Sequence, residues 1–205
     1  FLWADKDCVG EDWEGQVVNL LKRIFMNKQI VVLVNGRPAT GKTTLGKKIA
    51  SQLEVPFVCR DDIKELLFDN ISVGDREWSR KLGKASFVLM YYTVEKFLQS
   101  GKSFAIETVF TKEFAESKWK ELLDKYSFEL CQVFCTTDNE IRKQRFIDRN
   151  ESGERHPGHV DRANYDSEAS DELLPLDCSS RLVEVNTDNF KNVDVDKIVR
   201  QVLAK

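Results

Sequence analysis

The stretch that decides the fold runs from Ile30 to Thr43, and reads IVVLV at 30–34 and GRPATGKT at 36–43. The first part is a β-branched apolar run, which is typical of a strand buried on both faces of a parallel sheet. The second part matches G-x-x-x-x-G-K-[ST], and residues 42–53 follow it with apolar residues at helical spacing. A strand, a glycine-containing loop and a helix in this order predict a phosphate-binding loop, or P-loop.

The chemistry of this loop predicts a nucleoside triphosphate as its ligand. Gly36 and Gly41 allow the backbone to curl until several N–H groups point at phosphate oxygens, where the following helix adds its dipole. Lys42 would bridge the β- and γ-phosphates, and the Thr43 hydroxyl would ligate Mg²⁺. We therefore expect ATP and Mg²⁺ as cofactors. The expected nucleotide-binding residues are Gly36, Arg37, Pro38, Ala39, Thr40, Gly41, Lys42, Thr43 and Thr44.

Outward from the loop, strands and helices are predicted to alternate along the whole chain. The expected strands are at 30–34, 56–59, 104–106, 128–135 and 182–185. The expected helices are at 12–26, 42–53, 63–69, 77–99, 113–125, 138–150 and 194–204. This alternation predicts one α/β domain over residues 1–205, a three-layer P-loop fold with a five-stranded parallel sheet, helices on both faces and a small lid at about 140–160.

The predicted helix at 77–99 is the longest in the chain. It places Trp78, Leu82, Ala85, Leu89 and Tyr92 at helical spacing, and other apolar residues surround that stripe. We therefore expect this helix to be largely buried.

Composition excludes several classes of protein. The 205 residues are 41% apolar, and 31 Lys and Arg against 34 Asp and Glu give a net charge of −3. Such a chain is neither disordered nor covered by a broad nucleic-acid-binding surface. No apolar run has the length of a membrane span. The five cysteines form no CxxC pair, so we expect reduced thiols and a cytoplasmic protein.

Several classes of triphosphate-binding protein lack support in the sequence. The D-x-x-G and N-K-x-D motifs of GTPases do not follow the loop, and no LSGGQ-like segment of transporter ATPases is present. The strand at 103–107 ends in the single carboxylate of Glu107 rather than in an Asp-Glu pair. The small size and these absent motifs favour a phosphotransferase over a motor or a switch.

Two carboxylates, Asp61 and Asp62, directly follow the second predicted strand. The carboxyl ends of parallel strands share one edge of a sheet, so this position is near the P-loop. A carboxylate there can orient an acceptor hydroxyl and take its proton. Alternatively, the two aspartates only cap the helix predicted at 63–69.

The segment VCRDDIKELL at 58–67 resembles the polynucleotide 5′-hydroxyl kinases and the wider zeta-toxin and chloramphenicol-phosphotransferase-like group, the AAA_33-type ATP-binding P-loop kinases. The resemblance covers roughly residues 30–155. It implies that Asp61 is the general base and that Lys64 stands near the acceptor, where the polynucleotide kinases carry an arginine. The segment IETVF at 106–110 looks like the third-strand end of the same enzymes, which implies that Glu107 and Thr108 approach the acceptor or the metal. The polynucleotide kinases carry aspartate in place of Glu107, so the acceptor stays open.

A basic helix face and a polar loop form the predicted lid. Arg142, Arg145 and Arg149 recur at one helical face, and Arg155 follows in the stretch 151–159, which we expect to be a mobile loop. Arginines on a closing lid neutralise the transferring phosphoryl group and exclude water. Small P-loop kinases have a similar arrangement, which implies that Arg145 and Arg149 are catalytic lid arginines and that Arg155 contacts substrate. Alternatively, these arginines form a solvated helix face.

Three further polar features lie in the second half of the chain. The two histidines, His156 and His159, flank Pro157-Gly158, for which we expect a role in contacting the acceptor or as a hinge rather than metal binding. The turn at 186–188 is in a plausible place for the nucleotide base. Residues 161–177 concentrate acidic side chains, which leaves the rest of the chain slightly basic.

The sequence therefore predicts an ATP- and Mg²⁺-dependent kinase that phosphorylates a hydroxyl of a small molecule or of a nucleic-acid 5′-end. Its predicted catalytic residues are Lys42, Asp61, Arg145 and Arg149, its acceptor residues are Asp61, Asp62, Lys64, Glu107, Thr108 and Arg155, and its metal ligands are Thr43 and Glu107. The alternative is a regulatory protein that binds or hydrolyses ATP without a phosphoryl acceptor.

Overall fold

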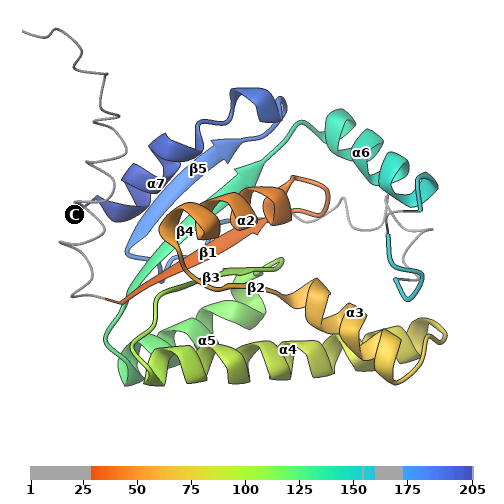
Figure 1. Ribbon diagram of the computed structural model, residues 1–205, viewed down its shortest axis with the longest axis horizontal. Coiled ribbons are helices and arrows are strands. Elements are labelled where there is room, and N and C mark those ends of the chain that lie inside the picture. Colours follow the sequence, from red (N-terminus) through yellow and green to blue (C-terminus); the bar gives the residue numbers. More distant parts are fainter. Residues whose placement is uncertain (1–28, 154, 160–172, 205) are drawn as a thin grey trace, which may run out of the picture.

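The computed structural model describes residues 29–153, 155–159 and 173–204, and in these residues five strands form one parallel sheet. The strand order across the sheet is β2-β3-β1-β4-β5, so the P-loop strand is in the centre (Figure 1). The strands are β1 (Ile30–Gly36), β2 (Phe57–Cys59), β3 (Phe104–Glu107), β4 (Glu129–Thr136) and β5 (Arg181–Asn186). The predicted five-stranded parallel sheet is confirmed.

Helices cover both faces of this sheet, as predicted for a three-layer fold. They are α2 (Lys42–Leu53), α3 (Arg60–Asn70), α4 (Arg76–Gln99), α5 (Lys112–Lys125), α6 (Asn139–Glu151) and α7 (Val195–Leu203), and a short 3-10 helix, η2, spans Phe190–Asn192. Helices α2 and α7 lie on one face and α4 and α5 on the other, while α3 and α6 lie toward the end of the sheet to which the strand arrows point (Figure 1).

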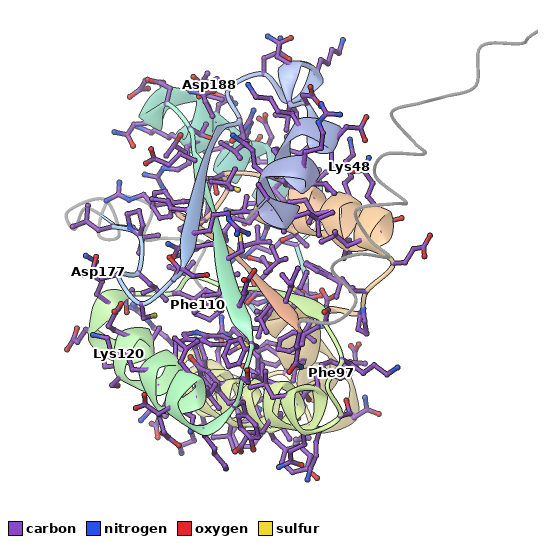
Figure 2. All side chains as sticks on the ribbon, turned by 90° about the vertical axis from the view of Figure 1, so that its left-hand side faces the viewer. Lys48, Phe97, Phe110, Lys120, Asp177 and Asp188 are labelled. Carbon is purple, nitrogen blue, oxygen red and sulfur yellow. The ribbon has the colours of Figure 1, made fainter. Side chains whose placement is uncertain are left out.

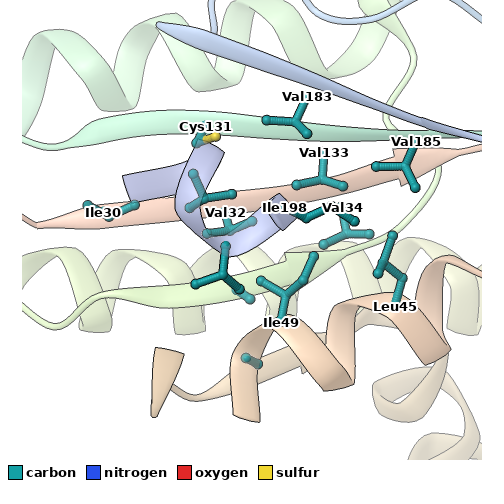
Figure 3. Close-up of a cluster of buried hydrophobic side chains, with 14 of the residues drawn as sticks. Ile30, Val32, Val34, Leu45, Ile49, Cys131, Val133, Val183, Val185 and Ile198 are labelled. Carbon is teal, nitrogen blue, oxygen red and sulfur yellow. The ribbon is translucent and has the colours of Figure 1, made fainter. Parts of the chain in front are cut away.

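The core is divided into two parts by the sheet. On the α2 and α7 side, Leu45 and Ile49 meet Ile198 of α7 and the valines of the central strands (Figure 3). On the other side, Trp119 of α5 and Met90 of α4 are fully buried against β1 and β3. Figure 2 shows side chains filling this second layer, where Phe110 is labelled. Because strands β1 and β3 are buried on both faces, they are apolar at 30–34 and 104–106, and polar residues come only at their carboxyl ends. The apolar run of β1 is why its sequence identified the sheet.

The register of the central strands fixes where functional groups can lie. Glu107, the last residue of β3, is paired with Val34 of β1 on one side and with Cys59 of β2 on the other. Neighbouring strands are about 4.8 Å apart. The P-loop begins two residues after Val34, and Asp61 comes two residues after Cys59, so both leave the sheet at the level of Glu107.

Two predictions about helices are wrong. Helix α4 is not largely buried: Val88 is 69% exposed and Tyr92 is 60% exposed. The buried face of α4 consists instead of Ser79, Leu82, Gly83, Ser86, Met90, Val94 and Leu98. Helix α3 begins at Arg60 rather than at residue 63, and no side chain caps it. Asp61 and Asp62 therefore lie in its first turn and are not its N-caps.

Other predictions fall on residues that the structure does not describe. The helix predicted at 12–26 and most of the acidic segment 161–177 lie outside the described residues. In the described part of the chain, no helix has both the length and the apolar character needed to cross a membrane.

Candidate active site

The P-loop adopts a backbone conformation that few residues other than glycine accept. Gly36 has a φ of 148°, and a Cβ at this position would lie 2.5 Å from the carbonyl oxygen of Cys135. Ala39 and Gly41 have φ values of 63° and 79°, in the left-handed region. The loop is tied by the Thr40 hydroxyl, which donates to the carbonyl of Arg37 at 2.9 Å. The loop therefore has the curled form expected of a phosphate cradle.

Helix α2 begins directly after the loop and leaves its first N–H groups uncapped. Its N-cap is Gly41, which has no side chain to accept their hydrogen bonds. These N–H groups and the helix dipole attract an anion. The ammonium of Lys42 is buried beside them and donates to the carbonyl of Arg37 at 2.9 Å. The buried cation and the free helix end together favour a highly charged anion such as a triphosphate.

Glu107 is the centre of the polar contacts under the loop. Its carboxylate lies 3.7 Å from the Lys42 ammonium, and its Oε2 accepts hydrogen bonds from the Thr43 hydroxyl and the Cys59 thiol, each at 3.0 Å. Burial and the adjacent carboxylate raise the pKa of the Cys59 thiol far above its usual range, so the thiol keeps its proton and acts as a donor. The structure thus brings together the two residues predicted as metal ligands, Thr43 and Glu107.

A buried amide holds the loop that follows Glu107. Asn35, at the end of β1, donates from Nδ2 to the carbonyl of Phe110 at 2.9 Å, and its Oδ1 accepts from the N–H groups of Phe110 and Gly36. Gln132 of β4 accepts a further bond from the same Asn35 amide. Thr108 is buried within the loop that these bonds fix. The P-loop and the Glu107–Phe110 segment are therefore positioned as one unit.

Asp61 lies on the neighbouring strand-to-helix junction and is partly exposed. Its carboxylate accepts a hydrogen bond from Arg60 Nη1 at 2.9 Å. Burial raises its pKa, but the positive charges of Arg60, Lys42 and Arg155 and the nearby His159 lower it more, so the net pKa lies below the usual value of 3.8. Asp61 is consequently ionised at neutral pH and within electrostatic reach of the P-loop lysine.

The other predicted acceptor residues on α3 differ in their positions. Lys64 is buried, with its ammonium donating to the Ser79 hydroxyl of α4 at 2.9 Å and lying 5.3 Å from the centre of the Phe68 ring. Asp62 points outward and is exposed. Of the two aspartates, only Asp61 is held in place by a neighbouring arginine.

Arg145 of α6 contacts the turn that follows β5. Its Nη2 donates to the carbonyls of Thr187 and Asp188 at 2.7 and 2.9 Å, and Thr187 in turn donates from its hydroxyl to the carbonyl of Thr40 in the P-loop at 2.8 Å. The second guanidinium nitrogen, Nη1, is buried and has no hydrogen-bond partner among the described residues. A buried donor without a partner, placed on the turn that holds the P-loop, is suited to a bound ligand.

The described part of the predicted mobile loop packs against α3. His156 stacks on Phe68 and lies 3.0 Å from Asp69 Oδ1, and His159 Nε2 lies 3.0 Å from Glu65 Oε1. Gly158 fits against the same ring, since a Cβ there would be 2.3 Å from Phe68. Residues 155–159 therefore fasten the end of the predicted lid to the helix that carries Asp61.

The remaining predicted lid arginines are Arg149 and Arg155. Arg149 is in the last turn of α6 and is half-buried. The guanidinium of Arg155 lies 5.5 Å from the centre of the Phe146 ring and contributes to the electrostatic potential at Asp61.

Three residues that the sequence analysis did not single out contribute to the site. Cys59 donates to Glu107, Arg60 pairs with Asp61, and Asn35 joins the P-loop to the segment after β3. Arg60 is the first residue of the R-D-D segment, so the sequence could have identified it as a residue of the site. Asn35 and Cys59 are ordinary strand-end residues, and their partners Phe110 and Glu107 lie 75 and 48 residues away in the chain.

Comparisons with known proteins agree with this geometry. The model of the family AAA_33, described as an AAA domain, matches residues 31–170. The chain belongs to this family. A "putative kinase" from Chloroflexus aurantiacus J-10-fl is 32% identical and superimposes with a TM-score of 0.79, over 85% of this chain and 96% of that protein. A search of curated proteins gave no match.

More distant solved structures share the fold of this AAA_33 chain. The Mycobacterium tuberculosis APS kinase CysC, in complex with AMPPNP and APS, superimposes with a TM-score of 0.53 at 13% identity, over 86% of this chain and 96% of that one. A structure from the PezAT toxin–antitoxin system of Streptococcus pneumoniae has a TM-score of 0.51 at 16% identity, over 71% of this chain and 66% of that one. The recognised P-loop kinase group and the P-loop kinase-like fold are thereby confirmed, and ATP binding follows from the family.

The residues present fit a magnesium ion. A threonine hydroxyl and a carboxylate are oxygen ligands of the type that Mg²⁺ prefers, and in Thr43 and Glu107 they are within 3.0 Å of each other beside Lys42. When bound there with ATP, Mg²⁺ would neutralise charge on the phosphates.

Proposed function

We propose that this AAA_33 protein is an ATP- and Mg²⁺-dependent kinase that transfers the γ-phosphate to a hydroxyl of an acceptor, with Asp61 as the general base. The observation that carries the proposal is the position of Asp61, which comes two residues after Cys59, the β2 partner of Glu107, and so leaves the sheet at the same level as the P-loop. An ionised carboxylate at that point is what in-line transfer to a hydroxyl requires and what nucleotide binding alone does not.

The proposed reaction forms a bond between the acceptor oxygen and the γ-phosphorus and breaks the bond between that phosphorus and the β–γ bridging oxygen. The acceptor proton passes to Asp61, and ADP leaves. The low pKa of Asp61 keeps the carboxylate ionised and ready to accept a hydrogen bond from the hydroxyl. Proton transfer to such a weak base comes late, after most of the phosphoryl transfer, as suits a loose transition state.

The cations around the loop supply the electrostatic part of the proposal. Lys42 would leave its contact with the Arg37 carbonyl for the β- and γ-phosphates. Arg145 would keep Nη2 on the turn after β5 and offer its unpartnered Nη1 to the nucleotide. Arg149 and Arg155 are proposed to neutralise charge on the transferring group when the lid closes.

The test is transfer from γ-labelled ATP to a panel of hydroxyl compounds, with wild-type protein, Asp61→Asn and Asp62→Asn. We expect label on an alcohol in the wild type and a loss of about 10²–10⁴-fold in Asp61→Asn, the range for a general base. Asp61→Asn keeps its affinity for ATP, because the Asp61 carboxylate does not belong to the phosphate cradle. Asp62→Asn, one residue away and exposed, retains most of the transfer and at most raises KM for the acceptor, because Asp62 is proposed to contact the acceptor but not to take its proton.

Two results would contradict this proposal. Near-normal transfer by Asp61→Asn would show that another group takes the proton. Label released only as free phosphate, with every class of alcohol present, would favour an ATP-hydrolysing regulatory protein.

A further inference from the structure

A strongly basic cavity lies between α3 and α4, beside Arg60. Its volume is about 580 Å³, which is within the usual range for small-molecule sites. Among the described residues, Glu77 is the only acidic residue in its lining, and Glu77 is already paired with Lys81 at 2.9 Å. The basic residues of the lining are Arg60, Lys64, Arg76, Arg80, Lys81 and Lys84.

Two of these cations are held in fixed positions. Arg60 donates from Nε to the Ser86 hydroxyl at 3.2 Å and lies 4.8 Å from the centre of the Phe87 ring, and the buried Lys64 donates to Ser79. The helix α4 also makes room for Arg60, because a Cβ at Gly83 would lie 3.1 Å from its Nη2. A solvated surface would leave long basic side chains free, whereas serine hydroxyls fix both of these, and Arg60 is paired with Asp61 as well.

The basic side chains that line this cavity outnumber the acidic ones and repel one another, and an anion that enters relieves this repulsion. Guanidinium and ammonium groups together favour phosphate, sulfate or carboxylate, with which arginine forms paired hydrogen bonds. The volume and the lining, which comes from residues 60–87 alone, suit a small molecule better than a polynucleotide.

The cavity is joined to the proposed reaction centre through one side chain. Arg60 lines the cavity and also holds the Asp61 carboxylate at 2.9 Å. An anionic group bound among the cations would therefore lie next to the group that receives the acceptor hydroxyl.

We infer that the phosphoryl acceptor is a small hydroxyl compound carrying an anionic group, a phosphate, sulfate or carboxylate, which binds in the cavity lined by Arg60, Lys64 and Arg80. That the bound compound is phosphorylated rests on the proposed kinase function, whereas the binding of an anion in this cavity does not.

Binding is tested first, without catalysis. The full chain is saturated with a non-hydrolysable ATP analogue and Mg²⁺, so that the P-loop is filled. It is then titrated in a calorimeter with inorganic phosphate, with sulfate, with acetate and with a short 5′-hydroxyl oligonucleotide. We expect at least one small anion to bind the wild type and Arg80→Glu to weaken it at least about 10-fold. Lys84→Glu provides a second cavity variant, and Lys102→Glu, an exposed charge reversal in the loop before β3, is expected to bind as the wild type does.

Transfer is tested next, with matched alcohols and γ-labelled ATP. Glycerol is compared with glycerol 3-phosphate and with glycerate, and ribose is compared with ribose 5-phosphate. The difference between glycerol 3-phosphate and glycerate shows whether the site prefers a phosphate or a carboxylate. We expect kcat/KM to be at least about 10-fold higher for an anionic member than for its neutral partner. Arg80→Glu should remove that preference through KM, with kcat little changed.

The outcomes separate this inference from the proposed function. Equal labelling of neutral and anionic alcohols by the wild type overturns the anionic acceptor and leaves the kinase. If anion binding depends on Arg80 but the label appears only as free phosphate, the anion site is supported and the kinase function is overturned. Anion binding that is unchanged in both cavity variants, or absent, overturns the inference, as does an oligonucleotide that binds more tightly than the small anions and weakens steeply with salt.

Discussion

The nucleotide side of the sheet edge is built differently from the side proposed to bind the acceptor, the acceptor side. On the nucleotide side, Lys42, Glu107 and Cys59 are buried, and their polar atoms contact one another or the P-loop. On the acceptor side, Asp61 is partly exposed and most of the cations between α3 and α4 face an open cavity.

This difference reflects what each side has to recognise. A triphosphate is the same ligand in every P-loop protein, so its cradle can be fixed in advance by short contacts. An acceptor varies from one kinase to another, and the site proposed for it here lies between α3 and α4, whose exposed residues can change without disturbing the sheet. Apart from Asp61, the proposed base, substitutions should therefore affect catalysis on the nucleotide side and affinity or stability on the acceptor side.

The largest expected effect is that of Lys42→Ala. It removes the cation proposed to contact the phosphates and leaves Glu107 without its ion pair, so we expect phosphoryl transfer to fall by about 10³-fold or more. Transfer from γ-labelled ATP measures the loss, and thermal unfolding shows whether the fold is kept. Lys47→Ala, on the exposed face of the same helix, serves as the control. Retained transfer would mean that the buried lysine is structural.

The next effect is that of Glu107→Gln. The amide can still bond to Thr43, but it lacks the charge that pairs with Lys42 and suits a metal. We expect transfer to fall about 10²-fold and half-maximal activity to need more Mg²⁺, as measured in a Mg²⁺ titration. The matched control is Glu129→Gln, which loses a pair with Arg181 at the opposite end of the sheet. An unchanged Mg²⁺ dependence would contradict the role of Glu107 at the metal.

A smaller effect is expected from Gly158→Ala on the acceptor side. The added methyl group would overlap Phe68 and push residues 155–159 away from α3. We expect the free energy of unfolding to fall by about 1–3 kcal/mol, the usual cost of overpacking, and KM for the acceptor to rise while KM for ATP is kept. Ser152→Ala, an exposed change just after α6, should alter neither. Equal increases in KM for the acceptor and KM for ATP would contradict the assignment of residues 155–159 to the acceptor side alone.

The smallest effect is a pH dependence of stability from His159. Burial and the positive charges of Arg155 and Lys64 lower the pKa of His159. Asp61 and Glu65 raise it by less, so the net pKa lies below the usual 6.5. Below pH 6.5 the unfolded chain therefore binds more protons than the folded one, so stability falls as the pH drops until the folded pKa is passed. A tenfold difference in proton affinity between the folded and unfolded chains corresponds to about 1.4 kcal/mol of stability. Denaturant unfolding between pH 7.5 and 5 should show that the free energy of unfolding falls less steeply with decreasing pH in His159→Gln than in the wild type. The same pH dependence in both proteins would contradict this role of His159.

The sequence predicted the sheet and the nucleotide site because both depend on local patterns. The buried central strand has to be apolar and β-branched, and the cradle needs glycine, lysine and threonine at fixed spacing within eight residues. The same reasoning placed Asp61 and Glu107 at one edge, because parallel strands all end on the same side. Helix boundaries were predicted to within a few residues, with α3 the largest error.

Contacts between distant segments were decided only by the tertiary structure. The exposed face of α4 could not be recognised, since Val88 and Tyr92 differ from buried residues only in where the helix is rotated against the sheet. The bond from Cys59 to Glu107 and the docking of His159 on α3 join segments 48 and 94 residues apart in the chain. The basic cavity depends on the packing of α3 against α4, which brings Arg60 and Arg80 to one space. A single sequence records the charge of each of these residues but not which charges share a site, because that follows from how the helices pack.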